Sequence, residues 1–428
     1  MSAFTFVHAA DLHLDSPFKG LSIDADQYPR IVQTLREATL TAFDNLVSLC
    51  LERQTSFLVI SGDVYDARDL SVRALFRFRD GLAKLADANI PVFIVHGNHD
   101  PVQRGASSKI EWPPNTHIFD PDGPHSEQVS VADDCVVQIS GISHGSPRVQ
   151  ENLARRFEAI DPAGHFHVAV LHCNVGTDTG HEPYAPCTLG DLVDMPVDYW
   201  ALGHVHTRNV LREGSPAVVY PGTPQGLHIR EPGEHGCYLV QVPAADAQPQ
   251  LEFCPLDAVR WQALDVDIAG IDTIDGLEDA ITRKLEAAAA EAEARPNIVR
   301  IAVTGRSPLF HTLQDAQARS DVLERIRTGA AENTPFVWIQ QLDVACLPEM
   351  DIEKRRRQND LVGRILSIAA DTAASEQEIG NVNASALAEL YKNTRARKAV
   401  DEPTPAEIRA FVQEAQLLCI DLLEETGE

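Results

Sequence analysis

The chain has 428 residues, of which 44% are hydrophobic and 23% are charged, a composition typical of a globular protein with two or three domains. Its formal net charge is −27, which argues against a protein that binds DNA by itself, because phosphate-backbone binders present a basic surface. No apolar run approaches the roughly 20 residues of a membrane helix, residues 1–10 lack the basic start of a signal peptide, and the 8 cysteines form no C-x-x-C pair. We therefore expect a cytoplasmic protein without a membrane association, a zinc ribbon or a redox motif.

The first hundred residues predict alternating strands and helices. Short apolar runs indicate strands at 5–9, 57–60 and 92–95, and apolar residues at helical spacing indicate helices at 29–53 and 71–88. This β-α-β-α-β order predicts a parallel sheet that is covered by helices.

The rest of the chain predicts more strands and then two further regions. Residues 109–145 look irregular apart from a strand at 135–140, and we expect strands at 167–171 and 199–202 followed by antiparallel strands at 218–220, 237–242 and 251–254. A change of composition near 244–250 precedes strands at 259–268, 298–303 and 336–342 and helices at 274–294 and 320–327. Residues 347–428 are predicted to be helical, with breaks at Gly380 and at 403–405. We infer three domains, at 1–255, 256–346 and 347–428.

Side chains that can bind metal ions follow the predicted strands at five places. Taken singly, an aspartate after a strand is more often a turn or cap residue, and a histidine beside a glycine is more often a solvated or core imidazole. Five such segments in order are difficult to explain by capping, and the carboxyl ends of strands are where ligands gather in α/β proteins. The residues are Asp11 and His13, Asp63, Asn98 and His99, His172, and His204 and His206.

This mixture of side chains suits hydrolysis by two metal ions. A carboxylate can bridge two cations, while imidazoles and an amide oxygen complete the coordination without excess negative charge. Two cations about 3.5–4 Å apart activate water and hold a phosphoryl group. Oxygen and imidazole donors without a thiolate favour Mn, Fe or Zn over Ca or Mg. We expect two divalent ions, with Mn²⁺ as the first choice and Fe or Zn as the others.

The motifs D-L-H, G-D-V-Y-D, G-N-H-D, L-H-C-N and G-H-V-H, in that order, resemble the calcineurin-like metallophosphoesterase superfamily. Within it, A-A-D-L-H-L-D-S-P near the N-terminus and Y-P-G-T-P-Q-G after the last motif look most like the SbcD/YhaO-type DNA-repair exonucleases. The resemblance covers residues 11 to about 226. It implies an α/β fold, a β-sandwich flanked by helices (αββα), followed by a small α/β capping domain and a helical C-terminal tail.

The resemblance also assigns roles to the residues that match its motifs. Asp11, His13 and His206 would hold the first metal, and Asn98, His172 and His204 the second, with Asp63 bridging the two. His99 would be the general acid that protonates the leaving 3′-oxygen or positions the phosphate. Asp100 would orient the ring of His99. Asp66 and His96 are interpreted as supporting residues rather than ligands.

The activity implied is that of a two-metal phosphodiesterase acting on DNA in repair, as an exonuclease with endonuclease cleavage as a further option. The chain has no G-x-x-x-x-G-K-[ST] loop, so it does not bind ATP by that route. The resemblance implies a partner, an SbcC/YhaN-like ATPase, and the amphipathic stretches 352–368 and 408–423 would suit its docking. The sequence leaves open whether the chain forms a homodimer. The alternatives are a phosphodiesterase or phosphatase for a small molecule, or a scaffold that binds metal without catalysis. The region beyond residue 255 argues against the first alternative, and His99 argues against the second.

Overall fold

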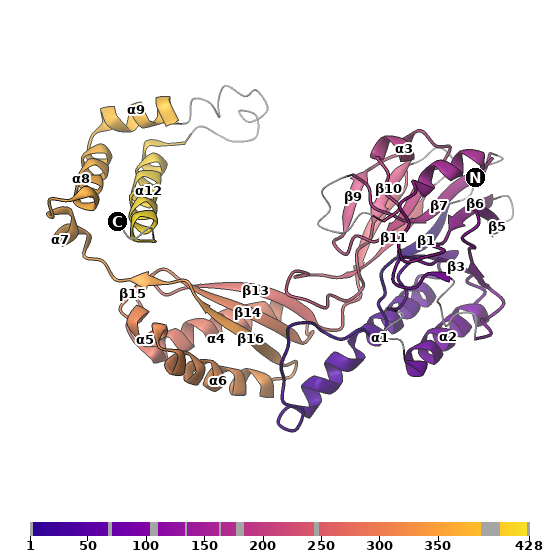
Figure 1. The fold of residues 1–428 in the computed structure, drawn as a ribbon, viewed down its shortest axis with the longest axis horizontal. Helices are drawn as coiled ribbons and strands as arrows, with labels where there is room; N and C mark the ends of the chain where they lie inside the picture. Colours follow the sequence, from indigo (N-terminus) through magenta and orange to yellow (C-terminus); the bar gives the residue numbers. More distant parts are fainter. Residues whose placement is uncertain are drawn as a thin grey trace. The chain divides into compact units, whose positions relative to one another are not determined.

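The computed structural model describes residues 3–66, 71–102, 110–132, 135–161, 164–176, 184–243, 248–386 and 403–425 (Figure 1). The chain divides into two compact units. The first contains Met1–Ile268, Asp272–Thr304 and Thr312–Ala345, and the second contains Ala269–Ile271, Gly305–His311 and Cys346–Glu428. The three-domain division drawn from the sequence stays a prediction.

A six-stranded sheet in the first unit carries the N-terminal motifs. Its first four strands in the chain are parallel to one another, and β11 and β12 extend it with antiparallel pairing. Helices α1 (Pro29–Glu52) and α2 (Val72–Asp87) lie side by side and bury their apolar faces against the sheet. The strand order is β12 (Gln250–Pro255), β11 (Gly236–Val242), β1 (Phe4–Ala9), β2 (Phe57–Ser61), β3 (Val92–Val95), β4 (Thr116–Ile118).

A second six-stranded sheet carries the remaining motifs. Its central strands β6, β7, β8 and β10 are parallel, and β5 and β9 pair antiparallel at the edges. The short helices η3 (Leu153–Ala159) and α3 (Leu189–Val193) pack on its outer face. The strand order is β5 (His125–Ala132), β6 (Cys135–Ile142), β7 (Phe166–His172), β8 (Tyr199–Gly203), β10 (Ala217–Tyr220), β9 (Asn209–Arg212).

Two expectations for this part of the chain were incomplete or wrong. The strand expected at 218–220 was taken as antiparallel, and β10 does pair antiparallel with β9, but its pairing with β8 on the other side is parallel because the intervening β9 reverses the chain first. The stretch 109–145 was expected to be irregular up to residue 135, yet it contains β4 and β5. β5 lies at a sheet edge and is largely exposed, so its polar sequence shows no apolar run.

The two sheets face each other across an aromatic core. Phe6 and Phe57 stack with ring centroids 4.8 Å apart, and Phe6 meets the edge of Tyr199 from the opposite sheet at 5.1 Å. With helices on both outer faces, this is the predicted αββα sandwich, and the fold prediction is confirmed. Burial of large apolar side chains between the sheets fixes the strand ends of both sheets relative to each other.

A small three-stranded parallel sheet follows in the same unit. It consists of β13 (Arg260–Asp267), β14 (Asn297–Thr304) and β16 (Val337–Val344), with α4 (Ile274–Glu291) and α6 (Ala316–Glu332) lying along it (Figure 1). Trp261, Ile298 and Trp338 pack in one buried cluster with Ile31 and Ala38 of α1. The predicted α/β pattern after residue 256 is therefore present.

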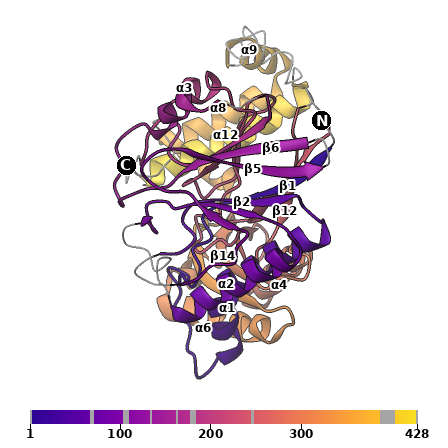
Figure 2. The ribbon, with the colours of Figure 1, turned by 90° about the vertical axis from the view of Figure 1, so that its right-hand side faces the viewer.

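The second unit is mainly helical. It contains the two-residue strands β15 (Arg306–Ser307) and β17 (Leu347–Pro348), and α5 (Phe310–Gln314) spans the boundary between the two units' ranges. The helices are α7 (Ile352–Arg356), α8 (Leu361–Ala374), α9 (Glu376–Ala386) and α12 (Pro405–Glu425). Figures 1 and 2 show α8 and α12 side by side, where Val362, Leu366 and Ile420 form a buried cluster.

The predicted break at Gly380 was wrong, because α9 continues through this residue. The helix instead starts after Ser375, whose hydroxyl accepts a hydrogen bond from the Glu378 N–H at 3.3 Å, a capping interaction that a single glycine does not outweigh. Within the described residues no helix is long and apolar enough to cross a membrane.

Candidate metal centre

The predicted ligands stand at the carboxyl ends of parallel strands from both sheets. β1, β2 and β3 deliver residues from the first sheet, and β7 and β8 deliver residues from the second. Because the two sheets pack face to face, these strand ends meet at one edge of the sandwich. The residues delivered there are Asp11 and His13 after β1, Asp63 after β2, Asn98 after β3, His172 at the end of β7, and His204 and His206 after β8.

Four of these residues have backbones in the left-handed region. The φ angles are 51° for Asp11, 42° for His13, 49° for Asp63 and 103° for His204. Each such conformation in a residue other than glycine costs on the order of 1–3 kcal/mol and persists only when the surroundings enforce it. Backbone hydrogen bonds do so here, since Asp11 N donates to Gly62 O at 2.9 Å and His13 N donates to Asp63 O at 3.1 Å. The strained turns point side chains from different strands into one site.

One donor group consists of Asp11, His13 and His206, whose ligand atoms lie within 4.8 Å of one another. The Nε2 atoms of His13 and His206 are 3.2 Å apart. His206 Nδ1 is 2.7 Å from a carboxylate oxygen of Glu231, to which it donates its proton. Its Nε2 therefore presents a lone pair to the site, as a metal ligand must.

The second donor group consists of Asp11, Asp63 and His172. His172 Nδ1 donates to the carbonyl oxygen of Ser61 at 2.9 Å, which leaves Nε2 facing the site. This nitrogen lies 3.0 Å from Asn98 Oδ1 and 3.3 Å from Asp63 Oδ2. A neutral imidazole with its proton on Nδ1 would oppose two oxygen lone pairs, so the arrangement needs a positive charge among the three atoms. A divalent cation fits this requirement.

A glycine makes the close approach at this group feasible. A Cβ atom on Gly97 would collide with Asp63 Oδ1 and with the ring of His172, at 2.7 Å from its Nε2. The glycine of the G-N-H-D motif is therefore needed for space beside the donor atoms rather than for a turn alone.

The remaining predicted ligand, His204, is placed differently from the others. Its backbone N–H donates to both oxygens of Asp11 at 3.1 Å, and its ring packs edge-on against that of His172 with centroids 5.4 Å apart. The carboxylate common to both donor groups is Asp11, whereas the family resemblance gives the bridging role to Asp63. The assignment of ligands to each metal stays a prediction.

The electrostatics of the buried site favour a cation. Burial raises the pKa of Asp11 to about 6 and lowers the pKa of His13 to about 3. Burial alone would also lower the pKa of His172, but the adjacent carboxylate of Asp63 outweighs it and raises that pKa to about 9. Burial would raise the pKa of Asp63, and the contact with His172 instead brings it well below its ordinary value. A proton on His172 thus offsets carboxylate charge that a metal ion would otherwise neutralise.

His99 lies at the rim of the site, and its side chain is 41% exposed. Its backbone N–H donates to Asp63 Oδ1 at 2.8 Å, and its ring meets the ring of His13 edge-on with centroids 5.0 Å apart. Its Nδ1 donates to Asp66 Oδ2 at 2.9 Å. An accessible imidazole held by a carboxylate beside the donor groups can act on a bound phosphate.

The expectation that Asp100 orients the ring of His99 was wrong. Asp100 is fully buried, and its two oxygens accept hydrogen bonds from Gly97 N at 2.6 Å and Val64 N at 2.8 Å. One oxygen also lies 2.9 Å from His96 Nδ1. The turn after Asn98 directs Asp100 inward to hold the backbone of two motif loops together, and Asp66 takes the position at His99.

Sequence reasoning missed Glu231, which contacts a predicted ligand from 25 residues further along the chain. The motif Y-P-G-T-P-Q-G marks the segment that precedes it. Nothing in that pattern distinguishes Glu231 from the neighbouring Glu234, so only the fold could identify it.

Comparisons with known proteins agree with this geometry. The sequence-family model of the calcineurin-like phosphoesterases matches residues 4–208, and the family model of the middle domain of metallophosphoesterase YhaO matches residues 261–347. A protein named uncharacterized metallophosphoesterase YhaO from Bacillus subtilis is 33% identical over 347 residues, which cover 80% of this chain and 82% of that protein. The chain belongs to the calcineurin-like metallophosphoesterase family. The predicted family membership is thus confirmed.

Proteins with lower identity are also similar to the chain. The DNA double-strand break repair protein Mre11 of Thermoplasma acidophilum is 24% identical over 325 residues, covering 72% of this chain and 79% of that protein. A dimetal phosphatase from Danio rerio aligns in structure with 59% of this chain and 99% of its own, at 15% identity and a TM-score of 0.36.

Proposed function

We propose that this metallophosphoesterase cleaves phosphodiester bonds of DNA as an exonuclease, with endonuclease activity as a further alternative. Its cofactor would be two Mn²⁺ ions. The observation that carries the proposal is the convergence of imidazole, carboxylate and amide donors with an accessible histidine at their rim. Support for DNA as the substrate comes from the Mre11 proteins named for double-strand break repair, one of which matches 72% of this chain.

When bound, the metal pair would supply an activated water and hold the scissile phosphate. The residues of the chain provide the rest of the chemistry. Glu231 and the Ser61 carbonyl fix the imidazoles of His206 and His172 with Nε2 facing inward. His99, oriented by Asp66, would deliver a proton to the leaving 3′-oxygen or position the phosphate.

The experiment that tests this proposal compares two substrates. Protein loaded with Mn²⁺ is incubated with end-labelled single- and double-stranded DNA and, separately, with bis-p-nitrophenyl phosphate. We expect cleavage of both, since the second substrate needs only the metal chemistry. Cleavage of bis-p-nitrophenyl phosphate alone would favour a small-molecule phosphodiesterase, and cleavage of neither by protein that contains metal would favour a scaffold.

We further propose that an SbcC/YhaN-like ATPase docks on the C-terminal helices. Large apolar side chains are exposed on these helices, among them Leu361 at 60% and Ile368 at 58% on α8 and Phe411 at 50% and Leu418 at 60% on α12. An amphipathic helix pair with such residues suits a helix-in-groove contact. Because the chain carries a net charge of −27, a partner that supplies a basic surface would also help it to reach DNA.

Co-purification tests the docking proposal. The full chain, the Phe411→Glu/Leu418→Glu variant and a chain that lacks residues 347–428 are each co-expressed with an SbcC/YhaN-like ATPase. We expect the full chain to retain the ATPase and the other two to lose it. Full recovery with the truncated chain would dismiss this docking site.

A further inference from the structure

Glu231 lies in the segment that follows β10 and links the backbone of this segment to the candidate metal centre. One carboxylate oxygen accepts the Nδ1 proton of His206 at 2.7 Å, and the other accepts the N–H of Leu227 at 2.7 Å. The Glu231 side chain is 18% exposed and that of His206 is 25% exposed, so the contact is partly shielded from water. The bond from Leu227 therefore holds the carboxylate in place, and the bond from His206 fixes the orientation of the imidazole.

His172 and His206 both direct Nε2 toward the site, and their Nδ1 atoms donate to different kinds of acceptor. His172 donates to a neutral carbonyl, that of Ser61, whereas His206 donates to a carboxylate. A carboxylate behind an imidazole makes its other nitrogen a stronger donor to a metal ion. The position formed by Asp11, His13 and His206 thus has a support that the position at His172 lacks.

The backbone that carries Glu231 is anchored on all sides. Its N–H donates to His228 O at 2.8 Å, and its carbonyl lies 3.1 Å from His235 Nε2. His235 is itself buried, with Nδ1 2.8 Å from the hydroxyl of Thr223. The segment cannot shift without breaking these contacts.

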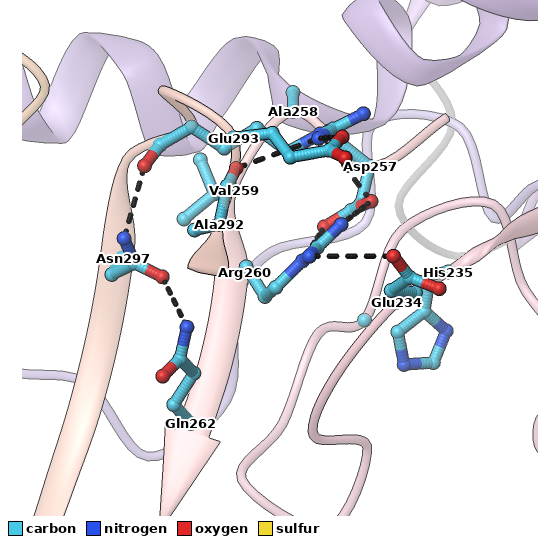
Figure 3. Close-up of polar contacts among 12 residues, drawn as sticks. Glu234, His235, Asp257, Ala258, Val259, Arg260, Gln262, Ala292, Glu293 and Asn297 are labelled. Atoms are coloured by element: carbon cyan, nitrogen blue, oxygen red, sulfur yellow. Dashed lines mark hydrogen bonds and ion pairs between the residues drawn. The ribbon is translucent and has the colours of Figure 1, made fainter. Parts of the chain in front are cut away.

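The same segment is tied to the start of the three-stranded sheet. The carbonyl of His235 accepts the N–H groups of Leu256 at 2.8 Å and Asp257 at 3.1 Å. Asp257 is buried and forms a two-point ion pair with Arg260, the first residue of β13, at 2.9 and 3.1 Å (Figure 3). Glu234 forms an ion pair with Arg260, and its carboxylate lies 3.6 Å from the Arg260 guanidinium. Figure 3 shows Glu234 facing Arg260.

We propose that Glu231 is a positioning residue that sets the cation affinity of the Asp11–His13–His206 position by holding the imidazole of His206. This inference rests on the proposed two-metal function. It states that a carboxylate outside the family motifs supports one of the two metal positions. Without the carboxylate the imidazole can rotate about its χ2 angle or carry its proton on Nε2, and either change removes the lone pair from the site.

The test measures metal binding as well as activity. Metal-free full-length protein is titrated with Mn²⁺ by calorimetry, and Co²⁺ loading is followed by visible absorption, which reports histidine ligation. We expect two sites in the unmodified protein. Glu231→Ala should weaken one of them by about 10–100-fold and leave the other unchanged. The Mn²⁺ affinity of Glu231→Gln at that site should lie between those of the unmodified protein and of Glu231→Ala, because the amide oxygen of glutamine can still accept the Nδ1 proton.

Glu234→Gln is the matched control, since it removes a carboxylate from the same segment that faces Arg260 and Arg208 instead of His206. It should bind both ions and unfold at the same temperature as the unmodified protein does. Metal-free Glu231→Ala should unfold at a somewhat lower temperature, because the N–H of Leu227 loses its acceptor. Two sites of full affinity in Glu231→Ala would overturn the inference while leaving the proposed function intact. An equal loss at both sites with a lower unfolding temperature would also overturn it. Failure of the unmodified protein to bind Mn²⁺ would instead refute the proposed function.

Discussion

The carboxylate of Asp66 lies 2.9 Å from Nδ1 of His99 and holds this exposed imidazole at the rim of the candidate metal centre. Asp66 follows Asp63 in the same motif loop, so one loop supplies both a predicted metal ligand and the group that orients the predicted general acid. Replacement of His99 or Asp66 should therefore affect catalysis with little effect on metal content.

His99→Ala should lower kcat for DNA cleavage by about 10²–10⁴-fold, the usual contribution of a general acid. Cleavage of bis-p-nitrophenyl phosphate should decline less, because its leaving group needs little protonation. Asp66→Asn should give a smaller loss of the same kind. Single-turnover rates and the Mn²⁺ content of each variant are the measurements. Unchanged rates on both substrates would remove the general-acid role.

Replacement of Asp100 should affect the stability of the fold, in contrast to replacement of His99 or Asp66. Asp100→Ala leaves the buried N–H groups of Gly97 and Val64 without an acceptor, which should lower the free energy of unfolding by about 2–5 kcal/mol. Urea unfolding of metal-free protein measures this loss. Asp66→Ala, a change at a partly exposed carboxylate in the neighbouring loop, serves as the control and should lose much less. Equal stability of the Asp100 and Asp66 variants would contradict the structural role of Asp100.

Gly97→Ala tests the space beside the second donor group. The added methyl group would meet Asp63 and His172, so either the donor atoms or the loop must move. We expect loss of Mn²⁺ binding at this position and a decline in kcat of about 10²-fold or more, since a displacement of 1 Å at a reacting centre has such an effect. Gly123→Ala is the matched control, because its methyl group has no neighbour within 4 Å. Normal metal stoichiometry in Gly97→Ala would show that the site tolerates the methyl group.

His8 should make the metal-free protein sensitive to mild acid. It is fully buried between the Tyr199 hydroxyl and Ser61, each at 3.0 Å, and burial lowers its pKa to about 3. Below its ordinary pKa of 6.5, the unfolded chain takes up a proton that the folded protein does not. The stabilising contribution is therefore complete above pH 6.5 and is lost as pH falls toward 3.

The expected slope from this residue is about 1.4 kcal/mol per pH unit between pH 6 and pH 4. Urea unfolding of the unmodified protein and of His8→Gln at several pH values, in the presence of a chelator, measures it. The variant keeps a polar side chain but does not titrate, so its slope should be shallower by that amount. Identical slopes would assign the acid sensitivity to other groups.

The sequence alone predicted most of what is local in this protein. Apolar runs placed β3 at residues 92–95, and helical spacing placed α1 within one residue of its observed end. Side chains after strands identified every residue of the two donor groups, because strand ends at a common sheet edge must place their next residues near one another. What failed locally was the exposed edge strand β5, whose burial pattern has no apolar period.

The partners of the site residues depended on the tertiary structure. Asp100 is adjacent to His99 in the sequence and Asp66 is 33 residues away, yet the fold directs Asp100 inward and brings Asp66 to the ring. Glu231 reaches His206 only because β10 and β11 belong to different sheets and the chain between them passes the metal centre. A hydrogen bond requires distances and angles that depend on packing throughout the sandwich. Residue types and spacing therefore determined the chemistry, and the packing of the two sheets determined which group supports each ligand.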